Sequence, residues 1–472
     1  MLILLLALIM PSTYYIDPES GNDRSNGTSP SAAWRSLEHA STVAFQPGDS
    51  LALKGGSILS GSLKLVGVKG LTIQSFGRGI ATIQGGAYDG VFVKNSESIK
   101  IENLHIRGAG RKANDGSGIR LLNVRSAVLE RVDVRGFRIA GIRVDAGRDI
   151  LISQSVANEN GAAGIEVSGE YDGLHRSQRI TIRDCKTISN AGDPKNLTNH
   201  SGSGIVVGAV DGCLIEYCEA AENGYDMPRE GNGPVGIWAW NASKVIIQYS
   251  ISHNNKSPGL DGGGFDFDGG VTDSIIQNCL SYNNVGTGYL ICQYSQGGLW
   301  KNNIIQNNIS YEDGFKNSQS GIALYTPPEM KNISDALIEN NTIVNSGYGV
   351  TTMHELPGMV FRNNVFVTKK ELFKLYWGEG GFKGSLFENN IAWGLTGEVP
   401  PIGDPKTFQD PDSWTAKNRT VDPQLLMPQS WKDLPTNPRL LNGLLWFKPS
   451  DKSPCRKDGK IVVGADMAKL PN

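Results

Sequence analysis

The sequence is short of the features that mark several common classes of protein. After residue 10 it has no apolar run that approaches the roughly 20 residues needed to cross a bilayer. The formal net charge of its 472 residues is only −2, which argues against a nucleic-acid partner. Strand segments alternating with long amphipathic helices are also missing. We therefore expect no membrane span, no nucleic acid and no alternating α/β fold.

Six cysteines are present, but they lack the spacing of a disulfide framework or a metal site. No Cys-x-x-Cys pair and no cluster of histidines occurs. Three of the six, Cys185, Cys218 and Cys279, end the similar segments IRDC, IEYC and IQNC. Since a free cysteine behaves as a small buried hydrophobe, we expect these three to stack as thiols inside the molecule, and we predict no metal ligands.

The first residues form a short apolar run, LILLLALIM at 2–10, followed by Pro11, Ser12 and Thr13. This pattern is typical of a signal-peptide core, and the alternative is a buried first strand. We expect residues 1–13 to be a signal peptide, truncated at its start because the usual basic residues are missing. The mature protein is then predicted to be secreted or periplasmic.

Two short segments alternate along most of the chain. The first kind starts with an apolar residue and ends in Cys, Ser or Asn, and its late copies converge on Asn-Asn, as in IQNN (305–308), IENN (338–341) and FRNN (361–364). Asparagine tolerates left-handed backbone, and its amides can bond one above another. We predict an internal asparagine ladder at a corner of a stacked structure.

The second kind of segment starts with glycine and continues with alternating apolar residues. Copies begin at Gly118, Gly141, Gly164, Gly204, Gly236, Gly264, Gly288, Gly321 and Gly349. Period-two alternation in short segments predicts strands rather than helices. A unit that cannot bury its own apolar side must stack on its neighbours, so the repeat predicts a solenoid in which Ile142, Ile165, Ile205, Ile237 and Phe265 form one internal column.

The remaining segments are expected to close the solenoid. Residues 14–100 are predicted to form an N-terminal cap, with a short helix, and the first coils. Residues 101–395 carry the repeat and the catalytic face, and residues 396–472, rich in Pro, Asp and Lys, are predicted to be irregular terminal rungs and a tail.

The chain resembles the pectin-lyase-like superfamily, both in this repeat and in its opening YYIDPESGNDRSNGTSPSAAW and FQPGDSLALKGG segments. The resemblance implies an all-β fold, a right-handed single-stranded parallel β-helix, and a carbohydrate-active protein. It does not supply catalytic residues. The NTDG, GHG and RIK motifs of polygalacturonases are missing, and GFDFDGG has the Phe-Asp of the mannuronan epimerases' FDPH but not the Pro-His. Because this superfamily contains several activities, the site has to be argued from its residues.

Strand alternation predicts which residues of the glycine-headed segments face outward. Positions two and four after each glycine are expected to face solvent. Asp266 and Asp268 then lie about 7 Å apart at Cα, a separation that suits the acid and the base or nucleophile of glycoside hydrolysis. One of the two pKa values should rise. Trp238 and Trp240, one rung earlier, are predicted to offer exposed apolar faces to a sugar ring.

Further residues are predicted to bind substrate at greater distance from the aspartates. Glu166 lies about three coils before Asp266 by this register, or about 14 Å away. The complete set of expected substrate contacts is Trp238, Trp240, Glu166, Arg143, Gln293, Tyr325, His354 and Glu355. Four loop residues, Asp226, Glu230, His253 and Asp261, are candidate third participants whose orientation the sequence leaves open.

The sequence favours a secreted glycoside hydrolase that acts on a polysaccharide or an oligosaccharide derived from it, with Asp266 and Asp268 as the catalytic pair. A polysaccharide lyase acting on a uronate polymer is the alternative, in which the aspartates hold Ca²⁺ and a loop supplies the base. A non-catalytic glycan-binding solenoid is the third. We expect a monomer that requires no cofactor, with Ca²⁺ as the ion that the aspartates suit.

Overall fold

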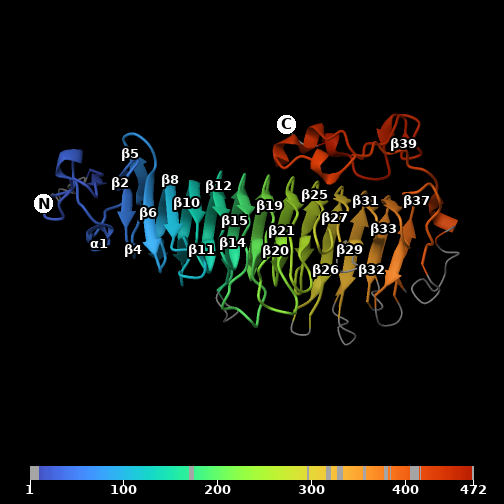
Figure 1. Cartoon of the computed structure of the whole chain (residues 1–472), viewed down its shortest axis with the longest axis horizontal. Coiled ribbons are helices and arrows are strands. Elements are labelled where there is room, and N and C mark those ends of the chain that lie inside the picture. The colour runs from blue at the N-terminus through green and yellow to red at the C-terminus, as the bar shows by residue number, and fades with distance from the viewer. Residues whose placement is uncertain are drawn as a thin grey trace, which may run out of the picture.

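The computed structural model describes residues 10–169, 175–294, 297–314, 320–326, 333–353, 358–376, 381–382, 384–403, 414 and 416–469. They form a long parallel β-helix whose axis is horizontal in Figure 1. Within these residues the strands make one 26-stranded sheet, one 12-stranded sheet and a two-stranded antiparallel hairpin of β39 (Arg456–Lys457) and β40 (Lys460–Ile461). No helix in the described residues is long and apolar enough to cross a membrane.

The 12-stranded sheet is built from the glycine-headed segments. Its strands, which pair in parallel with the same strand of the next coil, are β4 (Leu63–Val66), β7 (Val91–Lys94), β9 (Ile119–Leu122), β11 (Ala140–Asp145), β14 (Ala163–Ser168), β17 (Ser203–Gly208), β20 (Val235–Trp240), β23 (Gly263–Phe267), β26 (Tyr289–Cys292), β29 (Ser320–Tyr325), β32 (Tyr348–Thr352) and β35 (Phe373–Leu375). The predicted column from Ile142 to Phe265 is confirmed: these five side chains are fully buried and occupy equivalent positions on successive strands.

The 26-stranded sheet contains the segments that end in Cys, Ser or Asn. They are β8 (Glu97–Gly108), β10 (Arg125–Arg135), β12 (Arg148–Ser153), β15 (Ser177–Arg183), β18 (Val210–Glu216), β21 (Ser243–Gln248), β24 (Ile275–Gln277), β27 (Trp300–Gln306), β30 (Ile333–Glu339), β33 (Met359–Arg362) and β36 (Leu386–Glu388). The first coils add β1 (Thr13–Ile16), β2 (Ser50–Lys54), β3 (Ile58–Ser60), β5 (Thr72–Phe76) and β6 (Ala81–Gly86).

A third strand in each coil did not emerge from the sequence. It follows the strand that ends in Cys, Ser or Asn after a sharp corner, and it also belongs to the 26-stranded sheet. Its copies are β13 (Val156–Asn158), β16 (Lys186–Ile188), β19 (Glu219–Ala221), β22 (Ile251–His253), β25 (Leu280–Tyr282), β28 (Ile309–Tyr311), β31 (Thr342–Asn345), β34 (Val365–Thr368), β37 (Ile391–Gly394) and β38 (Arg419–Thr420). Most have three or four residues, too few for alternation to be recognised.

The predicted asparagine ladder is confirmed. It lies at the corner between the strand that ends in Cys, Ser or Asn and the third strand. The first residue of each Asn-Asn pair has a positive φ, for example 53° at Asn307 and 54° at Asn340. The second is fully buried, and both its backbone N–H and its side-chain amide donate to the next coil, as Asn308 does to Oδ1 of Asn341 at 3.0 and 3.1 Å. The ladder continues through Asn364, Asn390 and Asn418.

A second buried ladder, which the sequence did not indicate, runs along the corner after the third strand. It links Asn160, Asn190, Asn223, Asn255 and Asn284 in the same geometry and ends at Asp313. Oδ1 of Asp313 accepts the backbone N–H and the amide of Asn284, and Oδ2 accepts the Ser310 hydroxyl at 2.7 Å. Burial raises the pKa of Asp313 to about 6.

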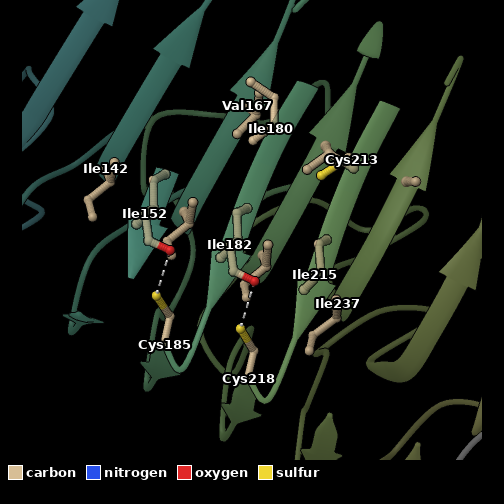
Figure 2. Packing of buried hydrophobic residues seen from close by; sticks show 14 of the residues in the cluster. Ile142, Ile152, Val167, Ile180, Ile182, Cys185, Cys213, Ile215, Cys218 and Ile237 are labelled. Carbon is tan, nitrogen blue, oxygen red and sulfur yellow. Dashed lines mark hydrogen bonds between the residues drawn. The ribbon is translucent and has the colours of Figure 1, made fainter. Parts of the chain in front are cut away.

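The cysteine row occupies the same corner as the first ladder, nearer the N-terminus. The thiols of Cys185, Cys218 and Cys279 donate to the carbonyls of Ile152, Ile182 and Ile247 in the preceding coil at 3.6, 3.6 and 3.8 Å. Figure 2 shows the first two of these bonds. All six cysteines are free and buried, which confirms the prediction of stacked thiols.

We expect all six thiols to react with iodoacetamide in unfolded protein that has not been reduced, and the folded protein to react far more slowly. Burial both blocks access and raises the thiol pKa, to about 12 for Cys213 and Cys279, so the nucleophilic thiolate is scarce. Intact mass after labelling counts the reactive thiols. A mass gain of fewer than six labels in the unfolded, unreduced chain would contradict this assignment.

The two ends of the solenoid are covered differently. At the N-terminal end, η1 (Pro30–Ala32) and the predicted short helix, α1 (Leu37–Ala40), precede β2. The C-terminal tail instead turns back along the flank of the solenoid, at the top of Figure 1, and carries η2 (Trp431–Asp433), η3 (Pro438–Gly443) and η4 (Met467–Lys469). Arg439 of the tail bonds Asp184 through two nitrogens at 2.8 Å.

Candidate active site

The outward columns of the 12-stranded sheet have the predicted register but are not exposed to solvent. Glu166, Val206, Trp238 and Asp266 occupy equivalent positions on successive strands, as expected. However, Trp238 is 3% exposed and Asp266 only 2%. The expectation of a bare face is therefore wrong here, because the long loops 192–202 and 224–234 fold over the strands.

Ion pairs and a ring contact hold these loops on the sheet. Asp193 pairs with Arg138 at 2.7 Å. In the second loop, Asp226 pairs with Arg111. The His200 ring meets the Trp238 ring edge to face, with 4.5 Å between centroids. The loops thus convert a flat sheet face into the wall of a cavity.

The cavity has a volume of about 430 Å³ and lies over β20, β23 and β26. The strands contribute Val235, Trp238, Trp240, Asp266, Leu290, Cys292 and Tyr325 to its lining, and the connecting segments contribute Asn199, His200, Arg229, Asn232, Gly233, Asp261, Asp268 and Tyr294. Three carboxyl groups therefore line this cavity. They are the two predicted catalytic aspartates, Asp266 and Asp268, and Asp261.

Asp266 forms the floor of the cavity and is held in its neutral form. Burial raises the pKa of its carboxyl well above the ordinary value, and the nearby charges of Asp268 and Asp261 raise it further. Within the described residues, Oδ1 of Asp266 is buried without a hydrogen-bond partner. An ionised carboxylate would be costly in such a place, so the cavity favours the protonated form of Asp266.

Asp268 and Asp261 lie at the two ends of the Asp266 strand and are less buried. Burial raises the pKa of Asp268, but the backbone N–H of Gly269 donates to Oδ1 at 2.7 Å and the Cys292 thiol donates as well, which favours its ionised form. Burial raises the pKa of Asp261 to about 6, against the N–H of Gly233, which donates to Oδ2 at 2.9 Å. The three carboxyls thus have separated acidities, the condition for dividing acid and base roles.

The two tryptophans both line the cavity but do not form an open stacking platform. The indole N–H of Trp238 donates to the Ser203 hydroxyl at 3.0 Å, which fixes the ring in the wall. Trp240 lies over Gly208 of the preceding strand so closely that a Cβ there would come within 2.1 Å of the ring. The absence of a side chain at Gly208 gives Trp240 its position beside Asp268.

Among the other predicted contacts, Tyr325 lines the cavity and Gln293 does not. Gln293 is 1% exposed, and its side-chain amide donates to the carbonyl of Gly298 at 2.8 Å within the loop that follows β26. The expectation that Gln293 bonds a sugar is wrong, since its amide braces this loop. Tyr325 is only partly buried and sits one rung beyond Cys292.

Arg143 and Glu166 lie outside the cavity. Arg143 is four strand steps from Asp266 and Glu166 three, as the register predicts. The Arg143 Nε bonds Asp145 at 3.0 Å, and NH1 lies 3.9 Å from Glu166. Arg143 and Glu166 therefore lie close to each other but far from Asp266 and Asp268. His354 and Glu355 lie outside the described residues.

Of the four loop candidates, the structure brings only Asp261 into the cavity. Asp226 is engaged by Arg111, Glu230 is exposed, and His253 is buried on β22, where it bonds Glu219 at 3.3 Å. Sequence reasoning missed His200, Arg229 and Tyr294. The first two lie in the long inserted loops, whose length was the signal that they cover a site. Burial lowers the pKa of His200 to about 4, so its ring is neutral near pH 7.

The side chains of the cavity do not favour a metal ion. In the described part of the chain, no group of three or more His, Cys, Asp or Glu is arranged to hold a metal ion. The neutral state of Asp266 also makes it a poor calcium ligand. No step below is routed through a metal.

Comparisons with known proteins agree with the fold. No curated protein matches the chain by sequence. Among solved structures, a lacto-N-biosidase of family GH136 from Eubacterium ramulus superimposes with a TM-score of 0.59 and 16% identity, covering 80% of this chain and 67% of that one. The A-module of a mannuronan C-5 epimerase from Azotobacter vinelandii gives 0.53 and 15%, covering 72% and 91%. A PL6 alginate lyase in complex with a trisaccharide gives 0.54 and 10%, covering 89% and 90%.

At these identities the likeness shows the fold alone. The profile of the family described as right handed beta helix region matches residues 60–202 and 174–366, which together span more than half of the chain. The strand order and the parallel registers described above are those of such a region. The chain therefore belongs to the right-handed β-helix family.

Proposed function

We propose that this protein is a secreted glycoside hydrolase whose active site is the loop-covered cavity over β20, β23 and β26. The observation that carries the proposal is the set of three carboxyls, Asp261, Asp266 and Asp268, in one cavity with separated acidities. Hydrolysis of a glycosidic bond requires one protonated and one ionised carboxyl on either side of that bond. The aromatic walls suit the apolar faces of a sugar.

The acidities and the access of each group assign the roles. Asp268 receives hydrogen bonds that favour the carboxylate, so it acts as the base or nucleophile. Asp261, partly accessible and titrating near pH 6, donates the proton to the leaving oxygen. Asp266 lies between them, and the raised pKa of its buried carboxyl favours the neutral form, which limits charge repulsion within the site.

The remaining lining positions the substrate. His200 is uncharged near neutral pH and can accept or donate a single hydrogen bond to a hydroxyl. Trp240, Tyr294 and Tyr325 supply apolar rings, and the last two add phenolic hydroxyls. With a volume of about 430 Å³, the cavity encloses a short stretch of glycan rather than an extended polymer.

One observation favours a polysaccharide lyase as the second candidate. Arg229, from the loop 224–234, lines the same cavity as the carboxyls, and β-elimination beside a uronate needs a base and a group that neutralises the uronate charge. A PL6 alginate lyase is also among the proteins that share the fold. Asp266 counts against this candidate, because its buried carboxyl favours the neutral form and so supplies neither the base nor a calcium ligand.

A panel of polysaccharides and oligosaccharides separates the functions. We expect the purified protein to release reducing ends from at least one substrate without the ultraviolet absorbance of an unsaturated sugar, and to keep this activity in EDTA. Reducing ends together with that absorbance would establish the lyase, particularly if added Ca²⁺ restored activity lost to EDTA. Binding without cleavage of any glycan would establish a non-catalytic solenoid instead.

A further inference from the structure

A second hollow, of about 360 Å³, lies on the same sheet face nearer the N-terminus. Its base is formed by Phe92, Arg120 and Arg143, which occupy equivalent positions on β7, β9 and β11. Arg143 is four strand steps from Asp266, or about 19 Å at roughly 4.8 Å per step. The hollow is therefore separate from the candidate active site and takes no part in the chemistry proposed above.

The arginines of this hollow form a like-charged pair with a shared counter-ion. Arg120 and Arg143 are direct neighbours on adjacent strands, an arrangement that is unfavourable unless the charges are balanced. The Nε of each bonds the same buried carboxylate, Asp145, at 3.0–3.1 Å. Glu166 is 3.9 Å from Arg143, and burial raises the pKa of its carboxyl, which weakens it as a second counter-ion.

The acidic residues that line the hollow are already engaged. Asp115 pairs with Arg138 at 3.0 Å and with Lys195 at 2.6 Å. Oδ1 of Asp89 accepts the backbone N–H of Ser117 at 2.6 Å. Lys64, one strand before Phe92, adds a further positive charge to the lining. The hollow thus presents an excess of cationic groups to whatever enters it.

Aromatic rings stand beside these cations. The Arg120 guanidinium lies 5.8 Å from the centroid of the Phe92 ring. Tyr88 is 73% exposed at the edge of the hollow, so its ring is accessible to a bound molecule. An apolar ring face next to guanidinium and ammonium groups matches a sugar that carries a carboxylate or a sulfate.

We infer that this hollow is a second carbohydrate-binding site, which takes an acidic sugar unit. The ring of the sugar packs on Phe92 and Tyr88, and its anionic group is bound by Arg120 and Lys64. Asp145 is the fixed counter-ion that orients the two arginines, and it is in turn held by the Ser168 hydroxyl at 2.9 Å. This inference concerns binding alone and does not depend on whether the distant cavity catalyses hydrolysis.

Calorimetric titration with uronate trimers tests the inference. The probes are trigalacturonate, trimannuronate and triguluronate, each compared with its carboxyl-reduced, neutral form. We expect at least one acidic trimer to bind, its neutral form to bind about tenfold more weakly or not at all, and the affinity to fall as salt is added. Failure of all three acidic trimers to bind would overturn the inference.

Variants locate the binding. Arg120→Met should weaken binding of the acidic trimer about tenfold or more, and it should fold normally because Arg143 and Ser168 still hold Asp145. Phe92→Leu should weaken it by a smaller factor. Arg125→Met, which removes an exposed arginine outside the hollow, is the matched control and should change nothing. If Arg120→Met binds like the wild type while Trp240→Ala loses binding, the trimer occupies the other cavity and the inference is wrong.

Discussion

Asp268→Asn should lower kcat/KM about 10³-fold or more on any substrate that the protein cleaves. The substitution is nearly isosteric but removes the carboxyl that accepts hydrogen bonds from both the Gly269 N–H and the Cys292 thiol, which favour its charged form. Loss of a general base typically costs 10²–10⁴-fold and loss of a nucleophile more. Steady-state kinetics measure the effect, with the thermal midpoint as a check on folding. Near wild-type turnover in this variant would remove the cavity from consideration as the active site.

The pH profile assigns the other two carboxyls. Because Asp261 must be protonated to act as the acid, activity should fall as the pH rises through about 6, and because Asp268 must be ionised, activity should also fall at low pH. The Asp261→Asn variant should have a low kcat, and its activity should no longer fall as the pH rises through about 6. Glu166→Gln, three strand steps away, is the matched control and should retain kcat. If Asp266→Asn abolishes activity while Asp261→Asn retains it with an unchanged profile, the proton donor is Asp266, one of the two residues of the catalytic pair predicted from the sequence.

Asp313→Asn should stabilise the protein at neutral pH by about 3 kcal/mol and leave its stability at pH 3 to 4 nearly unchanged. The pKa of Asp313 is raised from 3.8 to about 6 in the folded state, a difference of about two units at roughly 1.4 kcal/mol each. The folded state therefore becomes less stable as the pH rises from about 4 through 6. An asparagine continues the ladder from Asn284 without a charge to bury.

Urea unfolding at pH 4 and pH 8 measures this effect. The gap in unfolding free energy between Asp313→Asn and the wild type should open between those values. Asn284→Asp, one rung earlier, is the converse control: it places a second carboxyl against Asp313 and should destabilise the protein, more so at pH 8. An equal gap for Asp313→Asn at both pH values would show that the ionisation of Asp313 does not control stability.

The solenoid was predictable because each coil repeats the same local rule. Alternation in segments such as GIRVD at 141–145 fixes which residues face inward, and Ile142 and Val144 are indeed buried. The corner position taken in turn by Cys185, Cys218, Ser250, Cys279 and Asn308 was readable because each is a small polar or thiol group that can form a hydrogen bond with the preceding coil. The third strand of each coil could not be recognised in this way. In β22, for example, it has only three residues, too few to show an alternation of apolar and polar positions.

The site was only partly predictable, for a different reason. Alternation placed Asp266 and Trp238 on the correct face, but it carries no information about what folds over that face. The cover comes from inserted loops that close back through contacts such as Asp193 with Arg138, and no periodicity links residues 55 positions apart. His200, Arg229 and Asp261 enter the cavity by the same route. The loop lengths indicated where such residues would gather, and only the structure could orient them.

The folded-back tail constrains how this architecture can change in length. Arg439 forms hydrogen bonds with Asp184 and a cation–π contact with the Tyr217 ring. The backbone N–H of Ala465 donates to Thr342, and the N–H of Asp466 donates to Asn307. The tail thus spans a fixed series of coils. Duplicating or deleting one coil between Asp184 and β37 would put at least one of these contacts out of register by a full rung. Coils before Asp184 carry no such tie in the described residues. The tail therefore fixes the number of coils in the C-terminal half, and growth or shrinkage of the solenoid by whole coils is confined to the N-terminal half, away from the candidate active-site cavity.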